Sequence, residues 1–255
     1  MASINKELYG LIGYPLGHSF SQDFFNRKFA DENINAEYIN FEIASIDELP
    51  EIIRTHPDLC GFNVTIPYKQ AVIPFLDEID ADADRIGAVN VVRVRRDANG
   101  RTRLKGFNSD VIGFTDSISP LLTSHTHSQA LVLGTGGASH AVTAGLASLG
   151  ISSTSVSRTA RPGILTYGDL DVQTMASHTV IVNTTPLGMY PNVDACPDIP
   201  YEYLTARHVC FDLLYNPDVT QFMQRCAEHG AIVKNGLEML LLQAFASWEM
   251  WHRNA

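Results

Sequence analysis

The sequence predicts an α/β protein of two domains, and three observations support this prediction. Segments with the pattern of strands alternate with segments of helical spacing along most of the 255 residues, and strands separated by helices pair in parallel. A glycine-rich turn, residues 134–139, lies between a strand and a helix in the second half. The last segment, residues 237–252, has an almost entirely apolar face, so we expect it to pack against another part of the chain.

Composition and charge exclude several classes of protein. The hydrophobic fraction is 45%, which is enough for a substantial core. The longest apolar stretch is too short and too polar to span a bilayer, and the N-terminus lacks the pattern of an export signal, so we expect a cytoplasmic protein. The net charge of −10 without a basic stretch argues against nucleic-acid binding. The four cysteines form no close pair, and we expect them to be reduced and structural: Cys60, Cys196, Cys210 and Cys226.

The first half has the element order of a small α/β domain. Strands are predicted over residues 8–13, 38–43 and 59–65, with helical segments over residues 24–29 and 46–55. A further helix is predicted to begin at Pro67, because proline favours the first position of a helix. Residues 89–96 and 101–107 flank an Asn99-Gly100 turn and are therefore predicted to form a hairpin.

The second half begins after a helix predicted over residues 111–122, which leads into the second domain. Strands are then predicted over residues 130–133, 153–156, 179–182, 209–212 and 231–234, with helices over residues 138–149, 219–228 and 237–252. The pair His125 and His127 has no carboxylate or cysteine partner nearby in the sequence, so a polar linker is a better interpretation than a metal site.

The glycine-rich turn has the context of a dinucleotide site. Gly134-x-Gly136-x-x-Ser139 follows a strand and opens a helix. Gly134 permits the tight turn, Gly136 lets a pyrophosphate approach the backbone, and the amides of the next three residues lie at a helix N-terminus that favours phosphate. Serine replaces the third glycine, and a glycine-rich turn without ligand is the alternative.

The end of the following strand distinguishes between the two nicotinamide cofactors. An NAD site usually has an acidic residue about 20 residues beyond the glycines, to bind the ribose 2′-hydroxyl. This sequence instead has Ser157, Arg158, Thr159 and Arg161. Two guanidinium groups and two hydroxyls suit a 2′-phosphate, so the sequence favours NADP.

Two polar residues of the first half are candidates for proton transfer. Lys69 would fall in the first turn of the helix predicted at Pro67, where the helix dipole would lower its pKa and so assist proton transfer to and from an alcohol. A solvated surface lysine is the alternative. Asp110 follows Asn108 and Ser109 at the start of a predicted helix, so it could tune a lysine or simply belong to a helix cap.

A serine pair follows the first strand. Ser19 and Ser21 are spaced to face one side of an extended loop and could donate hydrogen bonds to a carboxylate near a helix N-terminus. One serine alone would be an ordinary cap. We expect the neighbouring His18 to be packed or capped rather than catalytic.

The motifs together resemble the shikimate dehydrogenase family. They run along nearly the whole chain in the family's order, and as a set they are highly specific. They are Gly-x-Pro-Leu-x-His-Ser-x-Ser at residues 13–21, Asn-Val-Thr-Ile-Pro-Tyr-Lys at 63–69, Gly-Ala-Val-Asn at 87–90, Asn-Ser-Asp at 108–110, the glycine turn at 134–139, Asn-Thr-Thr-Pro-Leu-Gly-Met at 183–189, Asp-Leu-Leu-Tyr-Asn-Pro at 212–217 and Gly-Leu-Glu-Met-Leu at 236–240.

The resemblance implies a fold and a set of site residues. Residues 1–107 with the helix of residues 237–255 would form a substrate domain, and residues 108–236 a Rossmann-like NADP domain. Lys69 and Asp110 would be the catalytic pair. The residues that would bind shikimate are Ser19 and Ser21 at its carboxylate, Thr65, Asn90 and Gln243 at its hydroxyls or ring edge, and Tyr215 nearby. The residues that would bind NADP are Gly134, Thr135, Gly136, Gly137, Ala138, Ser139, Ser157, Arg158, Thr159, Arg161, Met189, Gly236 and Met239.

The implied reaction is the reduction of 3-dehydroshikimate to shikimate with NADPH, a step of aromatic amino-acid biosynthesis. Hydride would go to the C3 carbonyl carbon, and Lys69 would give the oxygen its proton. Beyond the small-molecule substrate we expect no nucleic acid, membrane or metal, and a monomer or homodimer. Two alternatives are a quinate/shikimate dehydrogenase that uses NAD and a non-catalytic relative that senses a metabolite or nucleotide.

The sequence departs from the family pattern in a few places. Gln22 replaces the usual proline, Ser109 and Val111 replace threonine and glycine, and Ser157 stands where asparagine commonly precedes the arginine. Pro162-Gly163 occupies the region where relatives carry a full helix after the cofactor-reading loop. Because proline and glycine are poor helix formers, we expect that crossover helix to be shortened or lost and the adenine side of the site to be more open.

Overall fold

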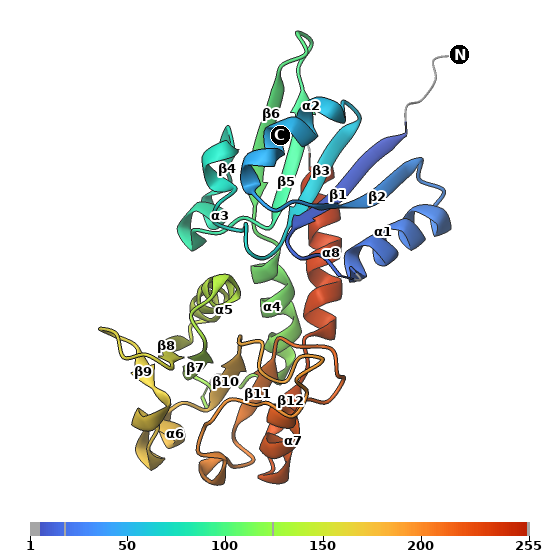
Figure 1. The fold of residues 1–255 in the computed structure, drawn as a ribbon. Coiled ribbons are helices and arrows are strands. Elements are labelled where there is room, and N and C mark those ends of the chain that lie inside the picture. The colour runs from blue at the N-terminus through green and yellow to red at the C-terminus, as the bar shows by residue number, and fades with distance from the viewer. Residues whose placement is uncertain (1–5, 18, 124, 254–255) are drawn as a thin grey trace. The chain divides into compact units, whose positions relative to one another are not determined.

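The computed structural model describes residues 6–17, 19–123 and 125–253. The chain forms two compact units, Met1–Ser109 with Ala244–Ala255 and Asp110–Gln243. Each unit contains one six-stranded sheet flanked by helices (Figure 1). The predicted α/β fold is therefore confirmed. His18, expected from the sequence to be packed, lies outside the described residues.

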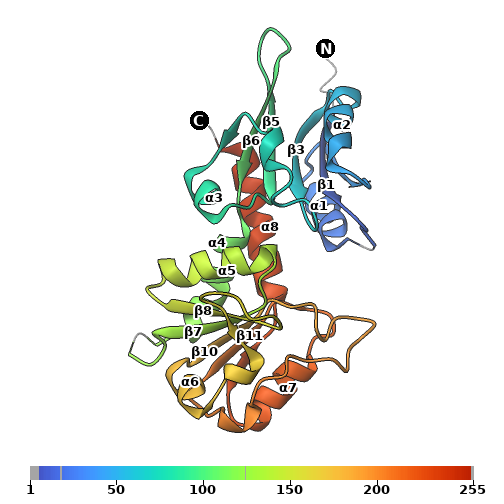
Figure 2. The same ribbon diagram turned by 60° about the vertical axis from the view of Figure 1, so that its left-hand side comes forward.

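The first unit contains a mixed sheet with the strand order β2-β1-β3-β5-β6-β4. Its strands are β1 (Glu7–Gly13), β2 (Ala36–Glu42), β3 (Leu59–Val64), β4 (Glu78–Ile79), β5 (Val91–Arg96) and β6 (Thr102–Phe107). The first three strands are parallel, as their helical connections predict. β5 and β6 form the predicted antiparallel hairpin, whose turn projects beyond the neighbouring strands (Figures 1 and 2). The two-residue strand β4 was not predicted.

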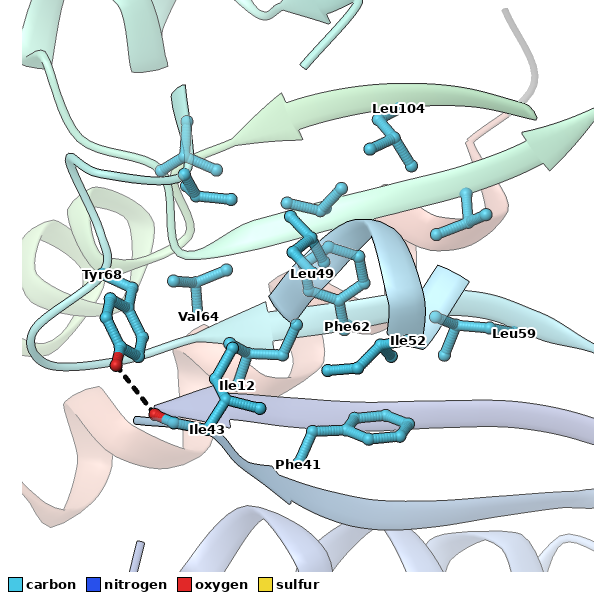
Figure 3. Packing of buried hydrophobic residues seen from close by; sticks show 14 of the residues in the cluster. Ile12, Phe41, Ile43, Leu49, Ile52, Leu59, Phe62, Val64, Tyr68 and Leu104 are labelled. Carbon is cyan, nitrogen blue, oxygen red and sulfur yellow. Dashed lines mark hydrogen bonds between the residues drawn. The ribbon is translucent and has the colours of Figure 1, made fainter. Parts of the chain in front are cut away.

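Successive side chains of each strand point to opposite faces of the first sheet. Both faces carry apolar side chains, and helices cover both of them. Leu8 and Ile12 of β1 point to a cluster that includes Leu49 and Ile52 of α2 (Leu49–Thr55), part of which Figure 3 shows. The intervening Tyr9 belongs to the opposite cluster. That cluster takes its helical side chains from α1 (Phe20–Asp31) and from the last part of α8 (Leu237–His252). The short α3 (Ala81–Ile86) also contributes to the first cluster.

The helix predicted at Pro67 does not form. Residues 66–72 contain turns and no helix, and the short 3-10 helix η2 (Ile73–Phe75) follows. The carbonyl of Lys69, which in a helix would accept from the amide of Ile73, accepts instead from the amide of Val89 at 2.7 Å. Tyr68 is drawn into the core, where its hydroxyl donates to the Ile43 carbonyl at 2.7 Å (Figure 3). These contacts with distant segments override the local helix signal.

The second unit contains an all-parallel sheet with the strand order β12-β11-β10-β7-β8-β9. This is the strand order of a Rossmann fold. Its strands are β7 (Gln129–Leu133), β8 (Ser152–Ser157), β9 (Leu165–Thr166), β10 (Val180–Asn183), β11 (Val209–Asp212) and β12 (Ile232–Lys234). Its helices are α4 (Asp110–Ile118), α5 (Gly137–Ser148), α6 (Val172–Ser177) and α7 (Gln221–Glu228).

Two apolar layers enclose this second sheet. On one face, side chains of α4 and α5 pack on residues such as Val132 and Phe211, together with Met239 from the beginning of α8. On the other face, Met175 of α6 and Phe222 of α7 pack on alternate strand residues. The buried strands read as continuous apolar runs because both faces are covered.

The connection from β8 to β9 confirms the expected loss of a crossover helix. Residues 158–164 form a short loop, closed by a bridge between Arg161 and Ile164. Gly163 has φ +75° within this loop, a conformation that favours glycine. The amide of Ile164 donates to the Arg161 carbonyl at 3.0 Å. Local turn chemistry therefore replaces the helix.

The C-terminal helix α8 contributes its apolar face to both units. Its first residues belong to the second unit, and the helix from Ala244 onward belongs to the first. Trp251 packs where Gly61 leaves room: a Cβ at Gly61 would lie 2.4 Å from the indole Cδ1. The indole nitrogen donates to the Val92 carbonyl at 3.1 Å. The predicted return of this helix to the first domain is confirmed.

One histidine of the segment before β7 has a structural role. His127 accepts from the amide of Thr123 at 2.8 Å, and its Nε2 bonds to the Arg207 carbonyl. In the described part of the chain no group of histidine, cysteine and acidic side chains is arranged to hold a metal. Within the same residues, no helix has the length and apolar character needed to cross a membrane. Among them, all four cysteines are free thiols.

Candidate functional site

The topology of the first unit brings four chain segments to one edge of its sheet. The carboxyl ends of the parallel strands β1 and β3 lie at this edge, and the antiparallel hairpin returns residues 88–90 and 107–109 to it. Backbone hydrogen bonds join the segments: the Tyr14 amide donates to the Ile66 carbonyl at 3.1 Å, and the Val64 amide to the Asn90 carbonyl at 2.9 Å. The candidate substrate residues of this unit therefore share one edge although they are far apart in sequence.

The predicted substrate residues of this unit occupy those segments. Ser19 is the N-cap residue of α1, and its side chain makes no capping hydrogen bond. Ser21 lies in the first turn of the same helix, and Thr65 and Lys69 lie in the loop after β3. All four are partly buried, whereas Asn90 is 3% exposed. This combination of anchored backbone and accessible polar side chains suits a small polar ligand.

The chain leading into Asp110 is fixed to the same edge. Asn108 donates to the Ala88 carbonyl at 2.9 Å, and the Ser109 amide donates to Asn90 Oδ1 at 2.7 Å. The neighbouring Val89 amide is bonded to the carbonyl of Lys69. The backbone one residue before Asp110 is therefore tied to the segment that also holds the backbone of Lys69.

The glycine-rich turn of the second unit lies at the carboxyl end of β7. β7 is flanked by β8 and β10, so the order of the chain reverses there, and ligands of such sheets bind at this reversal. Gly134 has φ +107°, and a Cβ there would lie 2.7 Å from the Thr184 hydroxyl oxygen. Only glycine fits this position. Gly134 thus has the tight-turn conformation that the sequence predicts.

The turn is shaped to receive a phosphate group. A Cβ added at Gly136 or Gly137 would meet nothing within 4 Å, so the backbone faces open space. Gly136 caps the 12-residue helix α5, whose first turn holds no acidic residue. The amides and the helix dipole at this end favour an anion. Ser139 differs from its neighbours, because both its amide and its hydroxyl donate to the Gly136 carbonyl.

The residues that would distinguish NADP from NAD follow β8. Arg158, Thr159 and Arg161 are all exposed, on the loop that replaces the crossover helix. The amide of Thr159 donates to the Ser157 hydroxyl at 3.3 Å, which orders the beginning of the loop. The donors present there, two guanidinium groups beside hydroxyls, fit a 2′-phosphate.

The remaining predicted residues of the second unit differ in exposure. Met189 and Tyr215 are 47% and 39% exposed. Met239 is buried among Phe114 and its neighbours, and Gln243 donates to the Leu240 carbonyl at 3.0 Å. Gly236 has a structural reason to be glycine, because a Cβ there would lie 2.1 Å from the Leu213 carbonyl oxygen.

Comparison with known proteins gives the same picture as the geometry. Residues 11–92 match the family description "Shikimate dehydrogenase substrate binding domain". A protein from Carboxydothermus hydrogenoformans named shikimate dehydrogenase (NADP(+)) is 37% identical, over 97% of this chain and 93% of its own. This chain belongs to the shikimate dehydrogenase family.

Solved structures of the family have the same fold. A shikimate dehydrogenase in complex with NADP+ matches with a TM-score of 0.86 and 30% identity, covering 98% of this chain and 91% of its own. The enzyme from Thermus thermophilus, in complex with NADP(H) and shikimate, matches with a TM-score of 0.82 and 27% identity, over 96% and 93% of the two chains.

A buried carboxylate that was not among the predicted site residues lies at the carboxyl end of the strands of the second sheet, the end that also carries the glycine-rich turn. Asp212, at the end of β11, is fully buried. It accepts hydrogen bonds from Thr220 Oγ1 at 2.6 Å, Asn183 Nδ2 at 3.0 Å and the Leu214 amide at 3.1 Å. Burial raises the pKa of Asp212 to about 6, although the three hydrogen bonds favour its charged form. It joins the loops that carry Met189 and Tyr215.

Asp212 is expected to make stability depend on pH. Its pKa is higher in the folded state than its ordinary value of 3.8, so between about pH 4 and pH 6 the folded state holds a proton that the unfolded state has released. This contribution to the free energy of unfolding is present below pH 4 and is lost as the pH rises through 6. Asp212→Asn should lack this loss, which amounts to roughly 3 kcal/mol in the free energy of unfolding between pH 4 and pH 7, because the pKa shift is about two units at 1.36 kcal/mol each.

The measurement is urea unfolding of both proteins from pH 4 to pH 7. Asp116→Asn, an exposed carboxylate on α4, is the matched control and should keep the slope of the unaltered protein. Curves for Asp212→Asn and the unaltered protein that run parallel over the whole pH range would contradict the prediction.

Three further buried polar side chains of the first unit, Tyr38, Asn63 and Ser247, were not among the predicted site residues, although Asn63 belongs to the motif of residues 63–69. The available signal was a polar residue inside an otherwise apolar segment, as for Ser247 on the apolar face of α8. That signal does not say which distant partner satisfies the polar group.

Proposed function

We propose that this protein catalyses the reversible NADP-dependent reduction of 3-dehydroshikimate to shikimate, a step of aromatic amino-acid biosynthesis. Family membership makes it an NADP-dependent oxidoreductase that acts on a CH–OH group. The observation that carries the proposal is the joint presence of a polar sheet edge with Lys69 and an open glycine turn followed by two arginines.

The substrate would be held by the polar edge of the first unit. The hydroxyls of Ser19 and Ser21 are donors suited to the carboxylate of shikimate, near the N-terminus of α1. Thr65 and Asn90 offer a hydroxyl and an amide from neighbouring segments, and both kinds of group suit the ring hydroxyls. Tyr215 and Gln243 of the second unit complete the proposed set.

Proton transfer would fall to Lys69 and Asp110. The Lys69 ammonium group donates a proton to the oxygen at C3 during reduction and takes it back during oxidation. The Asp110 carboxylate pairs with the lysine and accepts a hydrogen bond from a substrate hydroxyl. A general acid fixed at the reacting oxygen avoids a free alkoxide, which solvent would otherwise have to neutralise.

The second unit would hold the cofactor, which as NADPH would supply hydride to the C3 carbonyl carbon and as NADP+ would take it back in the reverse reaction. The residues proposed for this are the glycine turn with Thr135, Ala138 and Ser139, the loop residues Ser157, Arg158, Thr159 and Arg161, and Met189, Gly236 and Met239. The open space above Gly136 and Gly137 and the exposed guanidinium groups support this assignment.

The proposal is tested by following absorbance of reduced nicotinamide with shikimate or quinate and with NADP+ or NAD+. We expect the highest kcat/KM for shikimate with NADP+, because the β8 loop has two arginines and no acid, and because both Ser19 and Ser21 are present. Equal kcat/KM with both cofactors, or a preference for quinate with NAD+, would favour the quinate/shikimate alternative. Ligand binding without turnover would favour a sensor.

A further inference from the structure

A chain of hydrogen-bonded side chains runs beneath the substrate edge of the first unit. Tyr38 donates to Asn63 Oδ1 at 2.9 Å, and Asn63 Nδ2 donates to Ser247 Oγ at 3.0 Å. Ser247 Oγ bonds to Ser109 Oγ at 3.1 Å, and Asn90 Nδ2 donates to Ser109 Oγ at 3.0 Å. These five side chains come from five separate regions of the sequence: β2, β3, the residues before β5, the residues after β6, and α8.

The chain is buried from solvent throughout. Tyr38, Ser109 and Ser247 are 0% exposed, and Asn63 and Asn90 are 6% and 3% exposed. Hydrogen bonds in such a site are strong, and a group that loses its partner cannot turn to water instead. The position of each member therefore depends on the others.

The directions of the hydrogen bonds made by Asn63 and Tyr38 are fixed. Asn63 Nδ2 also donates to the Asn90 carbonyl at 3.2 Å, and a carbonyl can only accept. The Asn63 oxygen must therefore face Tyr38, and Tyr38 gives its proton to that oxygen. Burial raises the pKa of Tyr38, and an interaction of its hydroxyl with the Ser21 side chain opposes this effect, so Ser21 lies next to the Tyr38 end of the chain. The chain thus reaches from Ser21 to Asn90.

Ser247 is the member that joins the two ends. It is the one contribution of α8 to this set, and it bonds both to Asn63 of β3 and to Ser109, the residue before Asp110. The Ser109 amide in turn holds Asn90 Oδ1. The two hydrogen bonds between Asn90 and Ser109 orient the side-chain amide of Asn90, which is the group proposed to bind substrate.

We propose that Ser247 is a positioning residue for the substrate site. It fixes the Asn63 amide, and with it Tyr38 and Ser21 at the carboxylate end, and it fixes Ser109 and Asn90 at the hydroxyl end. This inference rests on the proposed function, since it assumes that Ser21 and Asn90 bind shikimate. Without the hydroxyl of Ser247, the site populates several arrangements, and apparent affinity falls with the fraction that remains competent.

The test compares Ser247→Ala with Ser117→Ala in the full chain. Ser117 is also 0% exposed, but it lies on α4 of the second unit and donates to Glu238 at 3.2 Å. We expect Ser247→Ala to raise KM for shikimate about tenfold, the effect of losing about one buried hydrogen bond, while KM for NADP+ stays within about twofold. Calorimetric titration with shikimate alone should show the same loss of affinity. Ser117→Ala should leave both shikimate constants unchanged.

A second variant, Ser247→Cys, keeps the proposal testable if Ser247→Ala does not fold. Ser247→Cys keeps nearly the volume of serine but has only a weak donor and acceptor, so it should raise KM for shikimate as alanine does. A purely structural role would lower the melting temperature and leave the kinetic constants of the folded enzyme unchanged.

The outcomes separate this inference from the proposed function. If the unaltered enzyme oxidises shikimate and both Ser247 variants keep its KM within twofold, the positioning role is wrong and the proposed function stands. If the unaltered protein neither binds nor oxidises shikimate, the proposed function fails and the inference fails with it. A selective rise in KM for shikimate supports both.

Discussion

Replacing Lys69 by alanine is expected to lower kcat for shikimate oxidation by about 10²- to 10⁴-fold, the usual contribution of a general acid or base. The methyl group cannot move a proton, so the reacting oxygen must exchange it with solvent. Shikimate affinity should change little, because the proposed carboxylate and hydroxyl contacts come from other residues: Ser19, Ser21, Thr65 and Asn90.

The measurement combines steady-state kinetics with calorimetric titration of shikimate. Lys105→Ala is the matched control, since Lys105 lies on β6 of the same unit and pairs with Glu78 at 3.3 Å in a surface salt bridge. It should retain the kcat of the unaltered enzyme. A kcat for Lys69→Ala equal to that of the unaltered enzyme would remove Lys69 from the proton transfer.

The position of Lys69 in the fold, and not a helix dipole, supports its role in proton transfer. A helix beginning at Pro67 would have placed its dipole at Lys69, but no such helix forms over residues 66–72. The support for Lys69 comes from the place of its backbone at the edge of the sheet. The carbonyl of Lys69 is bonded to Val89, next to the Asn90 side chain that holds the chain into Asp110.

Replacing Arg158 by alanine is expected to raise KM for NADP+ by about 10- to 100-fold, since a hydrogen bond to a charged group contributes about 1.5–3 kcal/mol. KM for NAD+, which lacks the 2′-phosphate, should change by less than about threefold. Replacing Arg161 as well should reduce the preference for NADP+ further. The loop between β8 and β9 contains no helix and leaves both arginines exposed, so removing one of them leaves a single guanidinium group on this loop.

Binding of adenosine 2′,5′-bisphosphate provides a readout independent of turnover, because this probe carries the 2′-phosphate and no nicotinamide. Arg207→Ala, an exposed arginine elsewhere in the second unit, is the control and should bind the probe as the unaltered protein does. Unchanged affinity of Arg158→Ala for both the probe and NADP+ would show that the 2′-phosphate is read elsewhere.

The sequence by itself determined the features that depend on local patterns. Alternation of apolar residues and turn signals located most of the strands and helices, and α8 matches its prediction from residue 237 to residue 252. The turn at Gly134 and the loss of the helix at Pro162-Gly163 follow from the backbone preferences of glycine and proline. These signals lie within a few neighbouring residues, so no knowledge of the fold was needed to read them.

Only the tertiary structure decided which polar groups are buried together. The loop at Lys69 differs from its prediction because its backbone bonds to Val89, 20 residues away. Asp212 has its raised pKa because distant segments cover it, and Ser247 meets Asn63 across 184 positions of sequence. Burial and hydrogen-bond partnership depend on elements that pack together after the chain has folded, and local spacing carries no record of them.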